Sequence, residues 1–242
     1  MKAWQERTEM LVGQAGMKAL ENAGVIVVGV GGVGAAAAEM LVRAGIGHIV
    51  LVDSDVFSVT NVNRQLPALH STVGKLKTEV LRARLEDINP EVDIKVVAEY
   101  VCEDNVAAIL DPFAADWVVD AIDTLSPKTA LIQYCLRRGI RLVSSMGSGA
   151  KFDATAVRIA DISKTKECPL AHMLRKRLHK LGIRSGFLAV YSEERPRLES
   201  VSLEESRNKK SQVGTISYLP TVFGCACAQA VVTSIVESVQ NC

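Results

Sequence analysis

A glycine-rich turn between a predicted strand and a predicted helix constrains the fold of this chain most strongly. Residues 25–30 form a β-branched run, and residues 35–44 are rich in Ala and have high helix propensity. Between them lies GVGGVG, whose glycines are Gly29, Gly31, Gly32 and Gly34. Glycines at this spacing permit a tight turn and close approach to phosphate, and the helix N-terminus supplies unpaired N–H groups. The motif therefore predicts a nucleotide-phosphate cradle.

The rest of the first 150 residues predicts an α/β fold of the Rossmann-like kind. Apolar runs predict strands at residues 48–52, 93–101, 117–122 and 141–145, and the segments between them predict helices at residues 77–88, 104–110 and 127–138. Strands that are apolar on both sides, alternating with helices, indicate a mainly parallel sheet covered by helices on both faces. We expect residues 1–150 to form the nucleotide-binding core.

Residues 151–242 predict an extension of the same sheet, so that residues 1–242 form one domain. Strands are expected at 156–162 and 187–191, and an amphipathic helix at 169–181 buries Leu170, Met173, Leu174, Leu178 and Leu181. The charged, Ser-rich residues 193–213 predict a mobile crossover loop. A helix that begins at Pro220 is rich in small and apolar residues, which predicts burial against the sheet.

Composition narrows the class of protein. The chain has 28 Lys and Arg against 27 Asp and Glu, and 48% of its residues are hydrophobic, which excludes a polybasic tail and a disordered protein. The first residues lack the pattern of a secretory signal, and the apolar stretches 25–38 and 222–236 are shorter than the roughly 20 residues that cross a bilayer. We expect a cytoplasmic protein without a membrane partner.

Polar residues that follow the second strand indicate which nucleotide the cradle holds. Asp53 lies 24 residues after Gly29, where a carboxylate accepts hydrogen bonds from ribose hydroxyls. Glycines and Asp53 alone would favour an NAD-dependent oxidoreductase. The polar and charged side chains after Asp53 are better suited to binding a triphosphate. They are Asp55, Asn61, Asn63, Arg64, Gln65 and Lys77. At the end of the fourth strand, Asp123 is placed to bind Mg²⁺.

Four motifs give the chain a resemblance to a known family. They are GVGGVG, LVDSDVFSVTNVNRQ, VGKLKTEVLRARLEDINPEV and VDAID, which together cover most of residues 24–125. With them the chain resembles the ubiquitin-activating-like, or ThiF-type, adenylating enzymes. The resemblance implies adenylation of a carboxylate by ATP, with Asp53 on the ribose, Arg64 and Lys77 on the phosphates, Asn61 and Gln65 in support, and Asp123 on Mg²⁺. It also implies a homodimer in which Arg7 enters the partner's ATP site.

The second half of the chain resembles one branch of that family. Residues 147–183, GSGAKFDATAVRIADISKTKECPLAHMLRKRLHKLGI, look like the branch that acts on transfer RNA, the tRNA threonylcarbamoyladenosine dehydratases. That branch uses ATP to cyclise the threonylcarbamoyl group of a modified adenosine through an acyl-adenylate, with release of AMP and pyrophosphate. The branch that activates sulfur carriers typically holds zinc on two CxxC pairs, and this sequence contains no CxxC pair.

A concentration of basic residues supports an RNA partner. Residues 163–184 carry seven positive charges against one negative charge, Glu167, in a chain whose net charge is +1. Such a cluster suits the RNA backbone, because each neutralised phosphate releases counterions. A solvated helix face would show the same charges. The candidate RNA-binding residues are Lys164, Lys166, Arg175, Lys176, Arg177, Lys180 and Arg184.

Several alternatives stay open at this point. Cys168 precedes a helix and lies near Lys166, so it is the best candidate for a nucleophile, although cyclisation needs none. Cys225 and Cys227 are expected in the core. A sulfur-relay partner such as a cysteine desulfurase is not identified. Competing functions are adenylation of the C-terminal glycine of a ubiquitin-like sulfur carrier, nicotinamide-dependent oxidation and nucleotide binding without catalysis.

Overall fold

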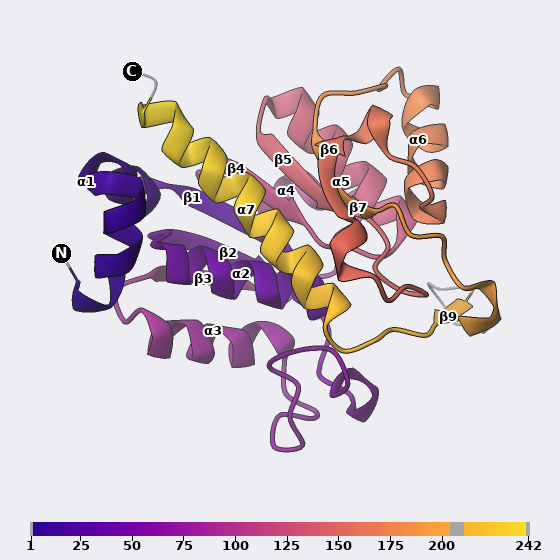
Figure 1. Cartoon of the computed structure of the whole chain (residues 1–242), viewed down its shortest axis with the longest axis horizontal. Helices are drawn as coiled ribbons and strands as arrows, with labels where there is room; N and C mark the ends of the chain where they lie inside the picture. The colour runs from indigo at the N-terminus through magenta and orange to yellow at the C-terminus, as the bar shows by residue number, and fades with distance from the viewer. Residues whose placement is uncertain (1, 204–210, 241–242) are drawn as a thin grey trace.

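The computed structural model describes residues 2–203 and 211–240, which are built around one seven-stranded sheet (Figure 1). The strands lie in the order β3-β2-β1-β4-β5-β7-β6. Their bounds are β1 Gly24–Val28, β2 His48–Val52, β3 Asp93–Val97, β4 Trp117–Asp120, β5 Arg141–Ser145, β6 Val157–Asp161 and β7 Leu188–Ser192. The helices are α1 Glu6–Asn22, α2 Gly32–Ala44, α3 Lys77–Ile88, α4 Val106–Leu110, α5 Leu125–Arg138, α6 Pro169–Lys180 and α7 Leu219–Gln240.

The sheet confirms the predicted mainly parallel, Rossmann-like fold. Every neighbouring pair from β3 to β7 is parallel, and only the edge strand β6 runs antiparallel to its neighbour β7. Because β1 pairs with both β2 and β4, the strand order reverses beside β1. In open α/β sheets, ligands bind at such a switch point, beyond the carboxyl ends of the strands. The glycine motif follows β1 at this edge.

Alternate residues of the strands enter two separate hydrophobic cores. On one face, Val25 and Val27 of β1 pack with residues of α1, α2, α3 and α7. On the other face, Ile26 and Val28 pack with residues of α4, α5 and α6. All five residues of β1 are buried, which explains why its sequence is apolar without alternation.

Helix α7 lies across one face of the sheet and packs closely on α2 (Figure 1). A Cβ atom at Gly224 would lie 2.5 Å from the carbonyl oxygen of Val33, so only glycine allows the two backbones to approach this closely. The sequence predicts an apolar stretch too short to cross a membrane. With 22 residues, α7 is long and apolar enough by length and composition, but 56% of its most apolar window is buried in the fold, which is typical of a core helix.

Residues 193–213 differ from the mobile crossover loop that the sequence predicts. In place of an irregular loop, strands β8 Val201–Leu203 and β9 Ser211–Val213 pair as a small antiparallel sheet. The part of the expected loop at residues 204–210 lies outside the described residues. Two strands are also shorter than expected: β3 ends at Val97 and not at residue 101, and β4 ends at Asp120 and not at residue 122.

Two expectations about buried faces need a similar correction. Helix α6 buries Ala171, Leu174 and Leu178, whereas Met173 and Leu181 are 49% and 46% exposed. In α7, Cys227 is buried as expected, but Cys225 is exposed. The 100° rotation per helical residue places neighbours two apart on different sides, so both cysteines could not share the core.

Candidate nucleotide-binding site

The glycine motif forms a turn that only glycine can make at two of its positions. Gly29 has φ +86°, and a Cβ there would lie 3.0 Å from the backbone of Ala121. A Cβ at Gly34 would lie 1.7 Å from the carbonyl oxygen of Gly29, so the first turn of α2 rests directly on the end of β1. The N-terminus of α2 therefore faces the space beyond the strand ends, where its N–H groups and dipole favour phosphate.

Asp53 is held beside this turn by two backbone donors. The N–H of Val30 donates to Oδ2 of Asp53 at 2.8 Å, and the N–H of Asp55 donates to Oδ1 at 2.8 Å. Burial raises the pKa of Asp53, and the ammonium of Lys77 and the two N–H groups oppose this rise without cancelling it. Its position at the end of β2, next to the glycine turn, suits a carboxylate that accepts hydrogen bonds from ribose hydroxyls.

Lys77 is buried at the N-terminus of α3 and already has a negatively charged partner. Its Nζ lies 2.7 Å from Oδ2 of Asp55, and only 7% of the Lys77 side chain is exposed, against 65% for Asp55. The backbone N–H of Lys77 also donates to the carbonyl of Asp55. Lys77 and Asp55 thus form a charged pair next to Asp53. Because Asp55 is the exposed partner, another anion could replace its carboxylate beside the Lys77 ammonium.

The segment from Asn61 to Gln65 packs against the glycine motif and bonds to the chain that leads into α7. Oδ1 of Asn61 accepts from the N–H of Ser58, and Asn63 Nδ2 donates to the carbonyl of Thr215 at 3.0 Å. Arg64 Nη1 donates to the carbonyl of Thr60 and to Oδ1 of Asn63, at 2.8 Å each. These bonds hold the Arg64 head group on its own segment.

Gln65 contributes an unpaired acceptor to the same place. Its side chain is 7% exposed and lies 3.6 Å from the position that a Cβ of Gly31 would take. Within the described residues, its Oε1 has no hydrogen-bond donor. A buried amide oxygen without a partner is uncommon.

A fully buried ion pair supports the end of β4. Lys128 Nζ donates to Oδ2 of Asp120 at 2.7 Å, and both side chains are 0% exposed. Ser144 Oγ donates to the same oxygen at 2.6 Å. The other oxygen, Oδ1, accepts from the N–H of Ile122 at 3.1 Å. Through this bond the pair fixes the turn that leads to Asp123, which is exposed.

Sequence reasoning missed Lys128, although a signal for it was present. Lys128 falls on the same helical face as Leu131, Ile132 and Cys135, all of which are buried. A lysine at a core position of an amphipathic helix requires a buried partner. Asp120, which precedes the expected magnesium ligand by three residues, is that partner.

The structure separates Arg7 from the other site residues of its own chain. Pro220, near the start of α7, would contact a Cβ at Gly32, whereas Gln240 at the far end of α7 donates to the carbonyl of Val12 in α1. Twenty helical residues separate these two contacts along α7, which corresponds to about 30 Å. Arg7 is exposed on α1, which lies at the opposite end of the sheet from the glycine motif (Figure 1).

The basic residues of the α6 region form two groups. Three of them bind groups on the protein: Lys166 pairs with Glu193 at 2.9 Å, Arg175 donates to the carbonyl of Thr165 at 2.7 Å, and Arg177 donates to Ser126 Oγ at 2.7 Å. The side chains of the others are exposed and make no hydrogen bond or ion pair within residues 2–203 and 211–240; they are Lys164, Lys176, Lys180 and Arg184.

Cys168 does not lie at an open surface. It is 5% exposed and precedes the first residue of α6. Lys151, which is 2% exposed, donates to the carbonyl of Ser192 at 3.0 Å. Burial lowers the pKa of Lys151, and the nearby Cys168 opposes that shift.

Within the described residues, no cluster of His, Cys, Asp and Glu side chains could hold a metal ion without further ligands.

Comparison with protein families identifies the family of this fold and site. The ThiF family model matches residues 5–241. The chain belongs to the ThiF family. The match covers the glycine motif, the Asp53 to Lys77 segment and the C-terminal extension alike, so the resemblance seen in the motifs is confirmed.

Relatives and solved structures agree with this assignment. The tRNA threonylcarbamoyladenosine dehydratase of Bacillus subtilis is 40% identical over 242 residues, covering 97% of this chain and 95% of its own. The Escherichia coli enzyme of that name, solved in complex with ATP, superposes with a TM-score of 0.90 at 35% identity, covering 100% of this chain and 98% of its own. A second E. coli structure contains AMP and gives a TM-score of 0.89.

Removing one partner of the buried ion pair should destabilise the protein severely. Lys128→Met leaves the carboxylate of Asp120 buried without a counter-charge, which typically lowers the free energy of unfolding by about 3–5 kcal/mol. The double variant Asp120→Asn, Lys128→Met has no buried charge and should recover most of this loss. Urea unfolding measures both. Arg82→Gln, which removes exposed pairs with Glu79 and Glu86, is the control and should cost about 0–1 kcal/mol. Equal stabilities of the single and double variants would contradict the role of the pair.

Acidification should weaken nucleotide binding through Asp53. The raised pKa means that the folded chain protonates Asp53 at a higher pH than an ordinary aspartate. The protonated carboxyl no longer accepts hydrogen bonds from both ribose hydroxyls, so the advantage of wild type over Asp53→Asn in ATP affinity, about 1.5–3 kcal/mol when ionised, should shrink as pH falls. Calorimetric titrations from pH 7 to 4 test this, and the Asn variant corrects for the titration of ATP itself. A constant advantage over this range would contradict it.

The same pKa shift gives a sign for stability. Because the folded state binds the proton of Asp53 more tightly than the unfolded state, this group's contribution to the free energy of unfolding decreases as pH rises from the unfolded pKa through the raised folded pKa. Ionised Asp53 therefore carries a cost to stability near neutral pH.

Proposed function

We propose that this protein is an ATP-dependent tRNA threonylcarbamoyladenosine dehydratase. The observation that carries the proposal is the end-to-end match to the B. subtilis enzyme of that name, which spans both the nucleotide-binding half and the C-terminal extension. The E. coli enzyme with ATP, which matches the whole chain, supports ATP as the nucleotide. Adenylation of a sulfur carrier would use the same ATP site but would need a groove for an extended peptide.

The proposed reaction uses the site in two steps. The threonyl carboxylate attacks the α-phosphorus of ATP and expels pyrophosphate, which gives an acyl-adenylate. A nitrogen of the same carbamoyl group then closes onto the acyl carbon, loses its proton and expels AMP, so the net change is loss of water. In the first step Asp53 holds the ribose, and Arg64 and Lys77 neutralise charge on the phosphates. Because the nucleophile of the second step is tethered, proximity supplies its rate advantage.

Asp123 is the residue that we propose for magnesium. Mg²⁺ usually takes one or two carboxylates and completes its shell with water and substrate phosphates, so a single strand-end aspartate is a sufficient protein ligand. The buried pair of Asp120 and Lys128 fixes the turn that carries Asp123. When bound, Mg²⁺ would neutralise phosphate charge.

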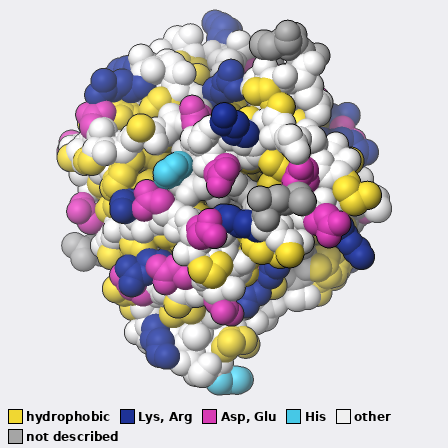
Figure 2. Space-filling view, turned by 90° about the vertical axis from the view of Figure 1, so that its left-hand side faces the viewer, with side chains coloured by type: hydrophobic (Ala, Val, Ile, Leu, Met, Phe, Trp, Pro, Cys, Tyr) yellow, Lys and Arg dark blue, Asp and Glu magenta, His cyan; other side chains and the backbone are white. Residues whose placement is uncertain are grey.

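The exposed residues of α6 are the proposed tRNA contact. Helix α6 lies beside the site, because Arg177 donates to Ser126, three residues after Asp123. The face that carries α1, at the other end of the molecule, instead mixes Lys and Arg with Asp and Glu (Figures 1 and 2). RNA bound over α6 could therefore place a modified base at the nucleotide cradle.

We also propose a homodimer with composite sites. Helix α1, which carries Arg7, contacts the far end of α7, about 30 Å along that helix from its contact with the glycine motif, so only a second copy could bring Arg7 to an ATP site. Large apolar side chains near Arg7 are exposed and suit an interface: Trp4 is 42% exposed, Met10 82% and Leu11 84%.

Because the substrates of the proposed reaction are ATP and tRNA, we infer a cytoplasmic location. A sulfur-relay partner remains a hypothesis, and buried Cys168 gives it no accessible thiol.

Activity on the modified nucleoside tests the proposed function directly. Incubation with ATP, Mg²⁺ and tRNA that carries threonylcarbamoyladenosine should convert the nucleoside to a product lighter by one water and release one AMP for each ring closed. Asp123→Ala should abolish conversion and keep the fold, whereas Asp87→Ala, an exposed carboxylate on α3, should retain activity. Nucleoside mass spectrometry is the readout. Adenylation of a ubiquitin-like carrier without any change in tRNA would favour the sulfur-carrier alternative, and thermal stabilisation by NAD but not ATP would favour the oxidoreductase.

Neutralising two exposed lysines of α6 should weaken tRNA binding and leave ATP binding unchanged. For Lys176→Gln, Lys180→Gln, the slope of log K against log salt should become shallower by about 1.5–2, because two phosphate contacts are lost. Lys18→Gln, Lys95→Gln removes the same charge at exposed positions on α1 and β3 and should leave tRNA affinity unaltered. Filter-binding titrations at several salt concentrations measure the slope. Equal slopes for the two variants would exclude α6 from the RNA contact.

Mixing two inactive variants tests whether Arg7 acts across a dimer interface. In a heterodimer of Arg7→Ala and Asp123→Ala chains, one site has Asp123 from the first chain and Arg7 from the second. Random pairing of equal amounts should restore up to about a quarter of wild-type activity. Co-expression followed by the dehydration assay measures this. If the mixture is no more active than either variant, or if Arg7→Ala alone is fully active, the site is not composite.

A further inference from the structure

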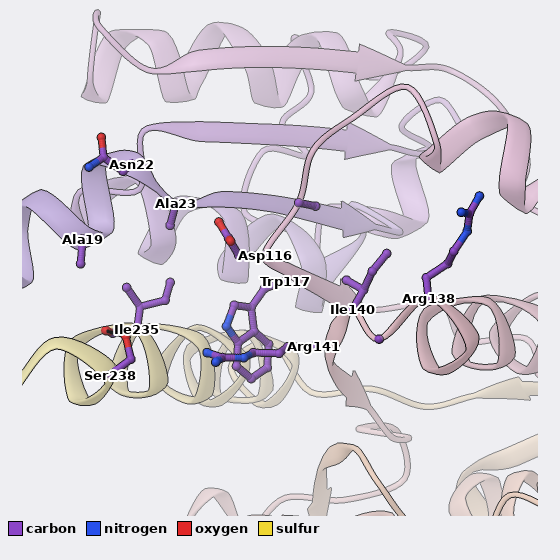
Figure 3. A pocket seen from close by; sticks show the side chains of 12 residues that line it. Ala19, Asn22, Ala23, Asp116, Trp117, Arg138, Ile140, Arg141, Ile235 and Ser238 are labelled. Carbon is purple, nitrogen blue, oxygen red and sulfur yellow. Dashed lines mark hydrogen bonds between the residues drawn. The ribbon is translucent and has the colours of Figure 1, made fainter. Parts of the chain in front are cut away.

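A second concave region lies at the amino ends of β4 and β5, far from the glycine motif. Its volume is about 570 Å³, within the range of small-molecule sites. The main lining residues come from the ends of α1 and α7 and from the starts of the two strands (Figure 3). Ile235 of α7 lines it, and fifteen helical residues, about 22 Å, separate Ile235 from Pro220 at the glycine motif. The cavity is therefore distinct from the nucleotide site.

Trp117, one of the residues that line this cavity, has a covered hydrogen-bond donor without a partner. The residue is 4% exposed, and within residues 2–203 and 211–240 its Nε1 has no acceptor. Figure 3 shows the indole nitrogen on the side of the ring that faces Ile235. A buried donor without a partner costs free energy, and a ligand acceptor that displaced the groups covering Nε1 would recover that cost.

Arg141 supplies a positive charge next to this donor. It is the parallel-sheet partner of Trp117, so the two side chains project from the same face of neighbouring strands. Arg141 is exposed, and its side chain forms no hydrogen bond or ion pair with the described residues. The guanidinium extends alongside the indole ring (Figure 3). Arg138 differs, because it pairs with Asp111 at 2.5 Å and points away.

The other lining groups limit what could bind. Asp116 contributes a carboxylate, but its Oδ2 accepts from the N–H of Gly24 at 2.9 Å. Ala19, Ala23 and Ile235 provide an apolar wall. A guanidinium and an N–H donor on one side of an apolar wall match an oxyanion attached to an apolar body.

We propose that this cavity is a second ligand site that binds a small organic oxyanion, a carboxylate or a phosphate ester with an apolar group. Arg141 and the indole N–H of Trp117 hold the charged oxygens, and the apolar group packs on Ile235. The site is independent of the proposed enzymatic function, because none of its residues belongs to the nucleotide cradle.

Calorimetry on the full chain with benzoate and phenyl phosphate as probes tests the proposal. At least one probe should bind saturably in the presence of saturating ATP, and the one that binds identifies the preferred oxyanion. Arg141→Gln should weaken this binding at least tenfold, and Trp117→Phe, which keeps the packing but removes the donor, several-fold. Arg137→Gln, an exposed arginine that does not line the cavity, should leave it unchanged. ATP affinity should be the same in all three variants.

Fluorescence locates the bound probe. The chain has two tryptophans, so in a Trp4→Phe background all tryptophan emission comes from Trp117. Saturable binding should change its emission with the same dissociation constant as calorimetry. Absence of saturable binding by both probes, loss of binding when ATP is added, equal binding of uncharged phenol, or unchanged affinity in Arg141→Gln would each overturn the proposal.

Discussion

An ion pair without access to water holds together the elements around the switch point of the sheet. Lys128 of α5 and Ser144 of β5 both donate to Asp120 at the end of β4, and the remaining oxygen of Asp120 accepts from the turn that follows. Ala121 in that turn rests on Gly29, so the geometry of the glycine motif depends on the same pair. Buried charges are costly unless they are fully paired. Removing one partner of this ion pair therefore destabilises the fold more than removing both.

The fold could be predicted well because its signals are local. The bounds of β2, β5 and α3 follow from apolar runs, and the helix that begins at Lys77 ends at Ile88 as the pattern predicts. The glycine motif identified the turn after β1, and the structure shows that a Cβ at Gly29 or Gly34 would collide with the backbone. The hairpin of β8 and β9 could not be predicted, because its strands are three residues long and lie among charged residues that are typical of loops.

The candidate site could be predicted only in part, because much of it depends on long-range contacts. Sequence order predicts that Asp53 and Lys77 lie near the glycine motif, and the structure brings them together. Sequence could not show that Lys77 is paired with Asp55, that Arg177 contacts Ser126, or that Lys128 is buried. Each depends on how separate elements pack. The structure places these residues, and the roles of all the site residues, Asp123 and Arg7 included, remain predictions.

The pairing of Lys77 with Asp55 bears on the proposed role of Lys77 as a phosphate ligand. An incoming phosphate does not meet a bare ammonium; it must displace, or share the ammonium with, a carboxylate 2.7 Å away. The electrostatic gain is therefore the difference between two attractions, and it grows with the charge of the ligand. A triphosphate outcompetes the carboxylate more readily than a monophosphate does. In the proposed reaction, Asp55 would pair with Lys77 again after pyrophosphate has left, and this pairing would favour product release.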